Sequence, residues 1–354
     1  MVEIKKIYSD FVVDEIPTWD LDKLDQNKGK FLILKLIKKD WNTISAINEV
    51  AKFLKTSSNN IGFAGTKDRH AITSQYISVK NISNQKLIEL KNDKSLQVKE
   101  GILIEYVGFN DVPLSLGDLN GNKFKIVVRD MVERGSLSLR KYFINYFDEQ
   151  RFSEQNVQIG KAIIKKNFKE AVFLIKNSKV LDALKLNPTD YLAALLKLPK
   201  KLLLLYVHAY QSYLWNETVT RYFKKNYNGL KTITYSQGEL VIAADNLFSD
   251  ILDLEIPIIG ALPFDSSVSI ELKKLMGDLM LEEDIDRFNF VIKQIPNMTQ
   301  EGGKRKVVVE LNDLNMSSVE DDDIFLGKKK QTVSFALGKG SYATMAIRFM
   351  LENQ

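Results

Sequence analysis

The order of predicted elements favours an α+β domain interrupted by a largely helical insertion. Strand-like segments dominate the chain up to residue 154, long helical segments run from Gln155 to Pro296, and strands return from Lys306. A sheet-forming region that resumes after a helical region is typical of an inserted domain. We therefore expect residues 1–154 and 304–354 to form one domain and residues 155–303 to be inserted into it.

Local patterns predict the elements of the first part. Phe31–Ile37 is a buried strand. Trp41–Thr43 then opens a helix whose apolar residues recur every three to four positions, at Ile44, Ile47, Ala51 and Leu54. Further strands are expected at Ile61–Ala64, Tyr76–Val79, Leu103–Val107 and Phe124–Val128, the last after a turn at Asn120–Asn122.

The insertion and the last part follow from the same rules. Asn156–Ile175 is amphipathic, and Leu202–Phe223 is one helix that places His208, Gln211 and Trp215 on one face. Strands are expected at Lys306–Leu311 and Gln331–Leu337, and a final helix is expected to begin with Ser341 as its N-cap.

Composition sets broad limits. The chain has 354 residues, enough for two domains, and it is 45% hydrophobic and 27% charged, as is ordinary for a globular protein. Its net charge of +5 is compatible with a nucleic-acid partner, although many proteins without one are equally basic.

The rarity of two residue types excludes several chemistries. The chain has no cysteine and only two histidines, His70 and His208. Disulfides, thiolate catalysis and cysteine-ligated zinc are excluded, as is a zinc site built on several histidines. We interpret both histidines as polar structural residues, with His70 pointing away from Asp68. We expect no metal and no cofactor.

No segment resembles a signal peptide or a membrane span. The first ten residues carry charges without an apolar core, and the longest apolar run, Leu202–Val207, is far too short for a bilayer. We expect a cytoplasmic protein without a membrane partner.

The loop Gly62–Gln75 is the most informative segment for function. Glycines punctuate it, strand-like residues flank it, and one carboxylate, Asp68, stands between Lys67 and Arg69. The flanking cations favour a charged carboxylate, and glycine lets backbone or ligand approach closely. These features are typical of a site where an aspartate acts as nucleophile or base towards an anionic substrate. A plain turn is the alternative.

The same loop resembles the catalytic-loop motif of the TruD family of tRNA pseudouridine synthases. It reads Gly-Phe-Ala-Gly-Thr-Lys-Asp-Arg-His-Ala-Ile-Thr-Ser-Gln. Four further segments resemble motifs of that family, in family order: Lys5 with Asp10–Glu15, Asn145–Phe147 with Gln150–Phe152, Gln211–Asn216, and Gly340–Thr344 followed by Arg348. The resemblance thus extends over almost the whole chain.

The resemblance implies a fold and a set of roles. The fold would be a mixed-sheet pseudouridine synthase core, residues 1–154 and 304–354, with a TRUD-type domain at 155–303 and RNA between them. Asp68 would be the catalytic residue. Lys5 would hold the Asp68 carboxylate charged, Asn145 would contact the catalytic loop or the uracil edge, and Phe147 would stack on the target base. Taken alone, Lys5 is a surface lysine, Asn145 a helix cap and Phe147 a core residue.

Some positions depart from the family pattern. Asp148 and Ser153 replace two glycines, Gly338 replaces a proline, and a proline expected before Asp10 is missing. Gly338–Ser341 lacks the spacing of a phosphate loop, so we interpret it as a tight strand-to-helix turn. The charged runs Glu320–Asp323 and Lys328–Lys330 are most simply solvated loops.

The sequence therefore predicts a monomeric tRNA pseudouridine synthase that acts on uridine, at position 13 by family analogy, through Asp68. One rival is a non-catalytic RNA-binding or RNA-chaperone protein on the same scaffold. Another is an aspartate-based hydrolase of small substrates, which the basic balance and the lack of a metal or histidine partner disfavour.

Overall fold

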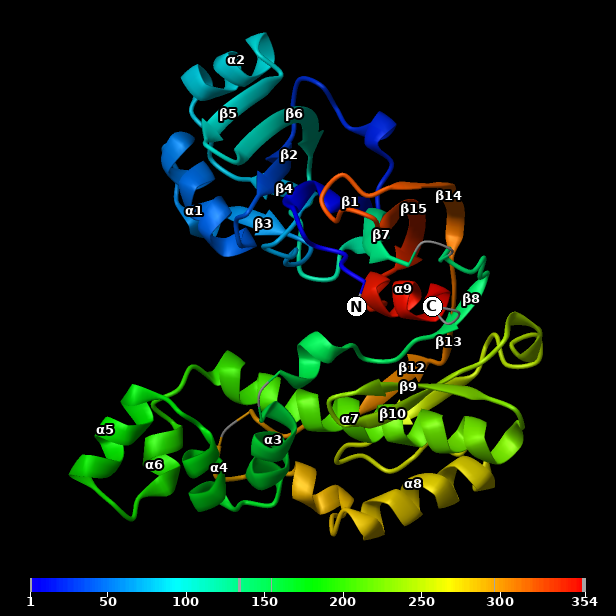
Figure 1. The fold of residues 1–354 in the computed structure, drawn as a ribbon. Coiled ribbons are helices and arrows are strands. Elements are labelled where there is room, and N and C mark those ends of the chain that lie inside the picture. The colour runs from blue at the N-terminus through cyan, green and yellow to red at the C-terminus, as the bar shows by residue number, and fades with distance from the viewer. Residues whose placement is uncertain (1, 133–134, 154, 296, 352–354) are drawn as a thin grey trace. The chain divides into compact units, whose positions relative to one another are not determined.

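A computed structural model describes residues 2–132, 135–153, 155–295 and 297–351. The chain divides into two compact units (Figure 1). Unit 1 comprises the described residues of Met1–Lys141, Glu310–Ala343 and Met350–Gln354, and unit 2 those of Tyr142–Val309 and Thr344–Phe349. The assignment of residues 1–154 and 304–354 to a catalytic domain, and of residues 155–303 to an inserted domain, stays a prediction.

Unit 1 is built on one mixed sheet. Its strand order is β14-β15-β7-β1-β4-β2-β6-β5, with β3 paired to β4. The strands are β1 Phe11–Pro17, β2 Phe31–Lys39, β3 Ile61–Phe63, β4 Ile72–Val79, β5 Ser95–Lys99, β6 Ile102–Asn110, β7 Leu119–Met131, β14 Asn312–Asp321 and β15 Lys329–Gly338. β1 and β4 run parallel at the centre, and the other pairs are antiparallel. The predicted α+β class with a mixed sheet is confirmed.

Two helices cover one face of this sheet beside β2, β4, β5 and β6: α1 Thr43–Phe53 and α2 Asn84–Asn92 (Figure 1). The predicted start of α1 is confirmed, because the Asn42 side chain accepts a hydrogen bond from the Ser45 N–H. The predicted apolar face is wrong at Ile44, which is 49% exposed. The other three predicted positions, Ile47, Ala51 and Leu54, are buried in the core as expected, and Ala46 and Val50 widen the buried face. Short 3-10 turns complete the unit: η1 Tyr8–Asp10, η2 Leu21–Lys23 and η3 Ser58–Asn60.

The predicted turn at Asn120–Asn122 is wrong, because these residues lie inside β7. Gly121 pairs with Ile16 of β1 and Gly338 of β15. A Cβ at Gly121 would lie 2.0 Å from the carbonyl oxygen of Leu337. The glycine therefore permits a close approach of two strands, where the dipeptide pattern had suggested a turn.

We expect Gly121→Ala to lower the free energy of unfolding by about 1–3 kcal/mol, because the clash is with paired backbone that cannot move aside. Gly303→Ala in β12 is the matched control, since no atom lies within 4 Å of the added Cβ. Urea denaturation of both variants measures the difference. Equal midpoints for Gly121→Ala and the wild type would contradict the close-packing interpretation.

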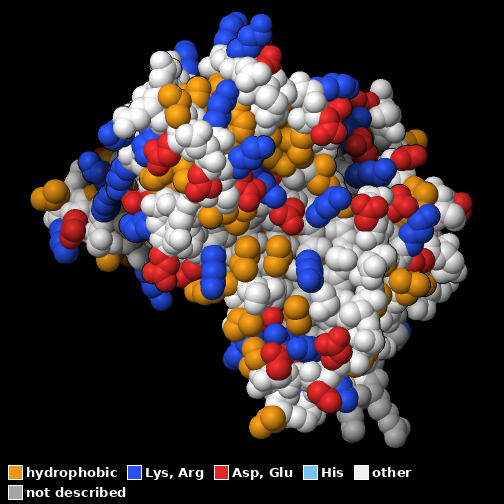
Figure 2. Space-filling model, turned by 90° about the horizontal axis from the view of Figure 1, so that it is seen from above, with side chains coloured by type: hydrophobic (Ala, Val, Ile, Leu, Met, Phe, Trp, Pro, Cys, Tyr) orange, Lys and Arg blue, Asp and Glu red, His pale blue; other side chains and the backbone are white. Residues whose placement is uncertain are grey.

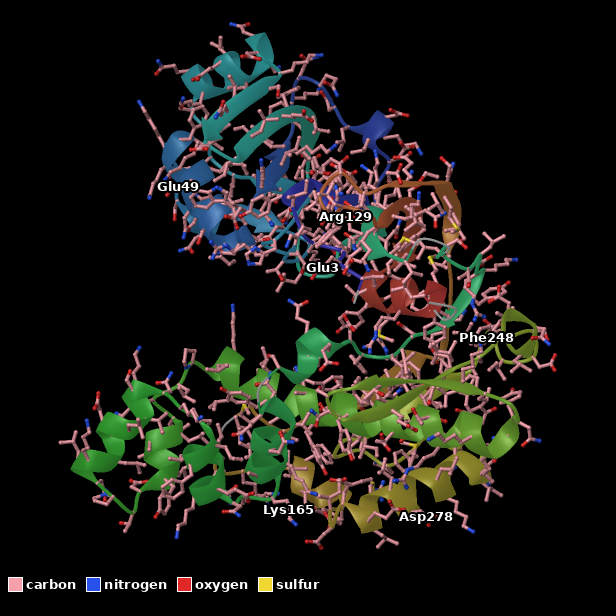
Figure 3. All side chains as sticks on the ribbon, in the orientation of Figure 1. Glu3, Glu49, Arg129, Lys165, Phe248 and Asp278 are labelled. Carbon is pink, nitrogen blue, oxygen red and sulfur yellow. The ribbon has the colours of Figure 1, made fainter. Side chains whose placement is uncertain are left out.

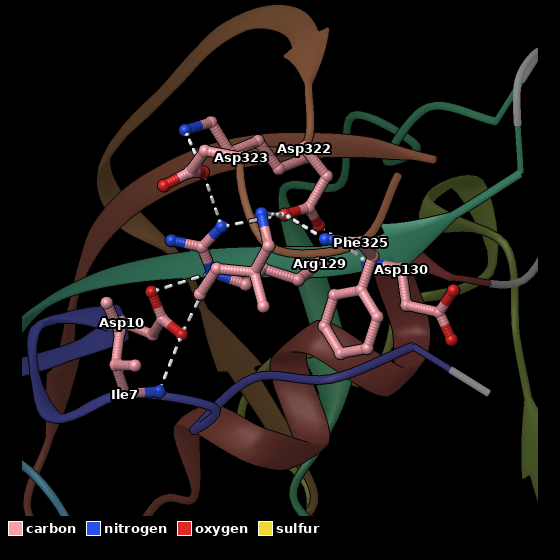
Figure 4. A network of polar contacts seen from close by, with 9 residues as sticks. Ile7, Asp10, Arg129, Asp130, Asp322, Asp323 and Phe325 are labelled. Atoms are coloured by element: carbon pink, nitrogen blue, oxygen red, sulfur yellow. Dashed lines mark hydrogen bonds and ion pairs between the residues drawn. The ribbon is translucent and has the colours of Figure 1, made fainter. Parts of the chain in front are cut away.

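Near the end of β7, the side chain of Arg129 binds three carboxylates (Figure 4). Its Nε donates to Asp10 at 2.9 Å, and its Nη1 donates to Asp322 at 2.9 Å and Asp323 at 2.7 Å. Burial opposes the charged guanidinium, but the bonds to Asp323, Asp10 and Asp322 outweigh burial and raise the pKa of Arg129. The expectation of a solvated loop at Glu320–Asp323 is thus wrong for Asp322, which is buried.

Arg129 also fixes the N-terminal segment that carries Lys5. The backbones of Glu3 and Arg129, both labelled in Figure 3, exchange hydrogen bonds of 3.0 and 2.8 Å. Asp10 accepts a further bond from the Ile7 N–H at 3.0 Å. The segment from Glu3 to Asp10 is therefore held on β7 at both ends, with Lys5 between them.

Unit 2 combines helices with three two-stranded sheets. The helices are α3 Asn156–Ile164, α4 Phe168–Leu174, α5 Ser178–Leu186, α6 Tyr191–Leu195, α7 Lys200–Asn226 and α8 Ile270–Glu282, and α9 Ala343–Met350 contributes Thr344–Phe349. The sheets pair β9 Lys231–Tyr235 with β10 Gly238–Ile242, β11 Glu255–Ile258 with β12 Gly303–Lys306, and β8 Tyr142–Ile144 with β13 Val308–Glu310. The 3-10 turns are η4 Glu149–Phe152, η5 Asp245–Leu247 and η6 Arg287–Phe290.

Three predicted boundaries in this region change. The amphipathic segment Asn156–Ile175 forms two helices, because Lys166 adopts a left-handed φ of 58° and Asn167 caps a new helix. The strand predicted at Lys306–Leu311 is divided between β12 and β13. The last helix begins at Ala343, two residues after the predicted cap Ser341. The long helix predicted at Leu202–Phe223 is confirmed as the centre of α7.

Charge is mixed on the surface seen in Figure 2, where cationic and anionic side chains are interspersed. The run Lys328–Lys330 follows this pattern: Lys328 lies 3.4 Å from Asp130, Lys329 lies 2.6 Å from Asp321, and Lys330 lies 2.5 Å from Asp323. Within the described residues, no helix has both the length and the apolar character needed to cross a bilayer.

Candidate active site

The loop that carries Asp68 connects β3 to β4 and is anchored through buried polar side chains. Thr43, at the start of α1, accepts a hydrogen bond from the Lys67 N–H at 2.9 Å and donates to Gln75 at 3.2 Å. Gln75 in turn donates to the Gly65 carbonyl at 2.9 Å. Because Thr43 and Gln75 are buried on rigid elements, they hold the backbone on the N-terminal side of Asp68 in one conformation.

A buried lysine holds the Asp68 backbone directly. The Nζ of Lys38, on β2, donates to the carbonyl oxygens of Asp68 at 2.6 Å and Lys67 at 3.3 Å. Burial lowers the pKa of Lys38 to about 8, attraction from Asp68 opposes this change, and repulsion from Lys67 adds to it. The ammonium form therefore still predominates at pH 7. Sequence patterns missed this residue, since Lys38 occupies the end of an apolar strand.

The Asp68 carboxylate is paired with Lys5. Their Nζ and Oδ2 atoms lie 2.7 Å apart, and the side chains are 28% exposed for Lys5 and 34% for Asp68. The Lys5 ammonium also lies 4.1 Å from the centre of the Phe11 ring. The structure thus brings together two of the four predicted site residues and leaves the carboxylate accessible to solvent.

The two cations next to Asp68 in sequence have other partners. The Lys67 side chain is buried and lies 2.7 Å from Glu15 of β1, and it donates to Asn122 of β7 at 2.7 Å. Arg69 donates to Asp40 at 3.1 Å. The cation that contacts the Asp68 carboxylate is therefore Lys5, 63 residues away in sequence, and not the flanking Lys67 or Arg69 that the sequence suggested would favour its charged form.

His70 contacts groups other than the Asp68 carboxylate. Its ring stacks on Tyr8 with centroids 6.3 Å apart, and its Nδ1 is 3.8 Å from Asp40. In unit 2, His208 is hydrogen-bonded to Gln300 at 2.8 Å.

Phe147 occupies a clamped position in unit 2. The amide of Asn216 on α7 accepts from the Phe147 N–H and donates to the Phe147 carbonyl, both at 2.9 Å. The ring packs edge-to-face on Trp215 with centroids 5.6 Å apart and is 8% exposed. It lines a pocket of about 230 Å³, together with Arg151, His208, Gln211, Ser212, Ile258, Gln300, Glu301 and Gly302.

Arg305 covers the Phe147 ring, and Asn145 holds Arg305 in place. The guanidinium carbon lies 4.1 Å from the ring centre. Arg305 donates to the Asn145 carbonyl at 2.9 Å and to its side-chain oxygen at 2.8 Å. The Asn145 side-chain nitrogen donates to the Lys306 carbonyl at 3.1 Å. The structure thus joins Asn145 and Phe147 through an arginine that sequence reasoning did not single out.

Two of the departures from the family pattern have local explanations. Asp148, at a family glycine position, accepts a hydrogen bond from Thr344 and lies 3.8 Å from Arg348 of α9. The second departure is Gly338, which stands at a family proline position. β15 ends at Gly338 and Gly340 has a φ of 85°, so the predicted tight turn before α9 is confirmed. Among the described residues, no group of three or more His, Cys, Asp or Glu side chains is arranged to hold a metal ion.

Comparison with known proteins decides the family. The family model described as tRNA pseudouridine synthase D (TruD) matches residues 1–179 and 173–350. This chain belongs to the TruD family. Membership confirms the family and the enzyme class predicted from the sequence, an RNA pseudouridine synthase.

Individual relatives match over nearly their full length. The chain is 29% identical to "Probable tRNA pseudouridine synthase D" of Thermococcus sibiricus, covering 99% of this chain and 95% of the relative. It is 30% identical to "tRNA pseudouridine synthase D" of Leptospira interrogans, covering 99% and 97%. Its fold is similar to the crystal structure of the putative TruD protein of Methanosarcina mazei, with a TM-score of 0.69 and 23% identity over 99% of this TruD chain and 93% of that one.

Proposed function

We propose that this TruD-family chain isomerises uridine to pseudouridine at position 13 of tRNA, with Asp68 as its catalytic carboxylate. The observation that carries the proposal is the solvent-accessible Asp68 carboxylate on a loop whose backbone is held by the buried side chains of Lys38, Thr43 and Gln75. A charged, accessible carboxylate in a fixed backbone is what a nucleophile or base requires.

The chemistry exchanges one glycosidic bond for another. The bond between C1′ and N1 of uridine breaks, the uracil turns, C5 bonds to C1′, the C5 proton leaves and N1 gains a proton, so the product is an isomer. The Asp68 carboxylate can serve as nucleophile towards the sugar and as base for the C5 proton. Lys5, 2.7 Å away, stabilises the negative charge on Asp68. No cofactor or metal enters this scheme.

Access to the sugar carbon requires the target nucleotide to leave its stack, and a flat aromatic ring is the usual support for an extruded base. In this scheme Phe147 stacks on the uracil. Arg305, held by Asn145, supports the Phe147 ring from the covered side. Asn145 acts on the substrate through this arginine, because its own amide is already bonded to Arg305 and Lys306.

The proposal is tested by incubating the protein with an unmodified tRNA transcript and mapping pseudouridine by carbodiimide derivatisation. We expect one new pseudouridine at position 13 and none in a transcript with cytidine there. Binding should weaken steeply with salt, because phosphate contacts release counterions. Tight binding without any pseudouridine would favour the non-catalytic RNA-binding alternative, and modification only at other positions would contradict the proposed target.

A further inference from the structure

A second site adjoins the Asp68 loop in unit 1. It is a pocket of about 760 Å³, within the ~300–1,000 Å³ typical of ligand sites. Its lining comes from the N-terminal segment, the end of β2, the start of α1, the Asp68 loop and the turn between β5 and β6. The residues are Tyr8, Lys39, Asp40, Trp41, Asn42, Ser45, Arg69, Lys99, Glu100 and Gly101.

The pocket is tied to Asp68 by chain continuity at three points. Arg69 directly follows Asp68. Lys39 directly follows Lys38, whose ammonium bonds to the Asp68 carbonyl. Tyr8 follows Lys5, the partner of the Asp68 carboxylate, within the segment that Arg129 holds in place. A ribose bound at Asp68 would therefore have its neighbouring nucleotide close to this lining.

Three cations, Lys39, Arg69 and Lys99, line the pocket. Arg69 is 60% exposed and uses its Nε for Asp40. In the part of the chain that the structure describes, no partner is found for the two terminal nitrogens of Arg69, which a phosphate would satisfy. Lys99 is 50% exposed and lies 3.2 Å from Glu49 of α1, labelled in Figure 3.

Two aromatic rings, Tyr8 and Trp41, accompany these cations. Lys99 lies 5.2 Å from the Trp41 ring centre, and Lys39 lies 5.7 Å from that of Tyr8. The Trp41 indole N–H donates to the Glu100 carbonyl at 3.1 Å, which fixes the plane of the ring. Cations interleaved with oriented aromatic rings are typical of surfaces that bind single-stranded nucleotides.

Asp40 organises this lining. It has a left-handed φ of 57°, which aspartate tolerates better than most residues. Its carboxylate accepts from Arg69 at 3.1 Å, and interactions with the Tyr8 hydroxyl and with Arg69 hold the pKa of Asp40 below its usual value. Asp40 thus holds Arg69 at the wall of the pocket.

We propose that this pocket receives the nucleotide adjacent to the target uridine, with its phosphate bound by Arg69 and its base stacked on Trp41. The inference rests on the proposed function and adds a second recognition point beside Asp68. A base must leave its own stack to enter the pocket. The sequence and flexibility of the RNA next to the target uridine should therefore affect tRNA affinity.

A double-mutant cycle tests the proposal with binding as its readout. Trp41→Leu is combined with tRNA transcripts that carry an abasic nucleotide immediately 5′ or 3′ of the target, and tRNA affinity is measured for all pairs. Loss of one stacked base corresponds to a fold-change of about 5 to 150. We expect either change alone to weaken binding by that factor, and both together to weaken it no further on one side of the target. Independent effects on both sides would overturn the stacking assignment.

Two controls complete the design. Phe53→Leu changes an aromatic residue of the same unit that lies under Lys86, outside the pocket, and it should leave affinity within about twofold. Arg69→Gln keeps a donor for Asp40 but removes the charge, and it should reduce the salt dependence of binding by about one phosphate contact. An unchanged salt slope would remove the phosphate from the proposal.

The failure of the proposed function and the failure of the pocket assignment can be told apart. If the wild type forms no pseudouridine, the proposed function fails. If the wild type forms pseudouridine and the cycle shows no coupling, only the pocket assignment fails.

Discussion

Asp68→Asn should abolish pseudouridine formation, lowering the single-turnover rate by ~10³-fold or more, while tRNA affinity stays within about threefold. The amide is nearly isosteric with the carboxylate but cannot act as nucleophile or base. Folding should survive, because the loop is anchored through the Asp68 carbonyl, the Lys67 backbone and the Gly65 carbonyl. Pseudouridine yield, tRNA affinity and the thermal midpoint are measured on the same preparations.

A matched control separates the site from general charge effects. Asp20→Asn removes an exposed carboxylate of the same unit that lies 3.3 Å from Lys23, and its activity should equal that of the wild type. Asp68→Asn activity within about tenfold of the wild type would remove Asp68 from the catalytic role, whatever the variant's stability.

Phe147→Ala should affect both stability and chemistry, and Phe147→Leu should separate them. The ring is buried against Trp215 and Arg305, so Phe147→Ala should lower the free energy of unfolding by about 3–5 kcal/mol. Leucine keeps most of the buried volume, so its effect should stay below ~1.5 kcal/mol. Both variants lose the aromatic face. This loss should raise the activation free energy by about 1–3 kcal/mol, which lowers the single-turnover rate per folded molecule by about 5- to 150-fold.

Thermal melts and single-turnover rates on saturating tRNA distinguish the two roles. If Phe147 is only a core residue, Phe147→Leu should be nearly as active as the wild type. Such a result would contradict base stacking by Phe147 and leave the Asn216 clamp as a purely structural feature of unit 2.

Local sequence patterns were sufficient for elements whose own residues determine them. The β2 strand is mostly apolar up to Ile37, α1 begins at an asparagine cap, and α7 carries His208, Gln211 and Trp215 at helical spacing. The Asp68 loop was evident for a similar reason, because its glycines, carboxylate and cations are contiguous in the chain. Five such blocks in one order are enough to indicate the family.

The charges around Asp68 could not be assigned in this way. Sequence adjacency suggested that Lys67 and Arg69 favour the charged carboxylate, and only the family resemblance pointed to Lys5. The fold brings Lys5 to the carboxylate and directs Lys67 to Glu15 and Arg69 to Asp40. Ion pairs depend on distances between side chains from separate strands. Those distances follow from sheet order and register, which no local pattern encodes.

The same limit explains Gly121, Lys38 and Arg305. Gly121 suggested a turn, but its lack of a side chain serves a close contact with Leu337, more than 200 positions later in the chain. Lys38 and Arg305 are ordinary cations in the sequence, and they become a loop anchor and a ring cover only through contacts with Asp68 and Phe147. The sequence by itself therefore determined most element types and the family, and it pointed to Asp68 as the proposed reacting carboxylate. Tertiary structure decided which charges and rings surround that carboxylate and its predicted partners, because long-range packing alone brings them within reach.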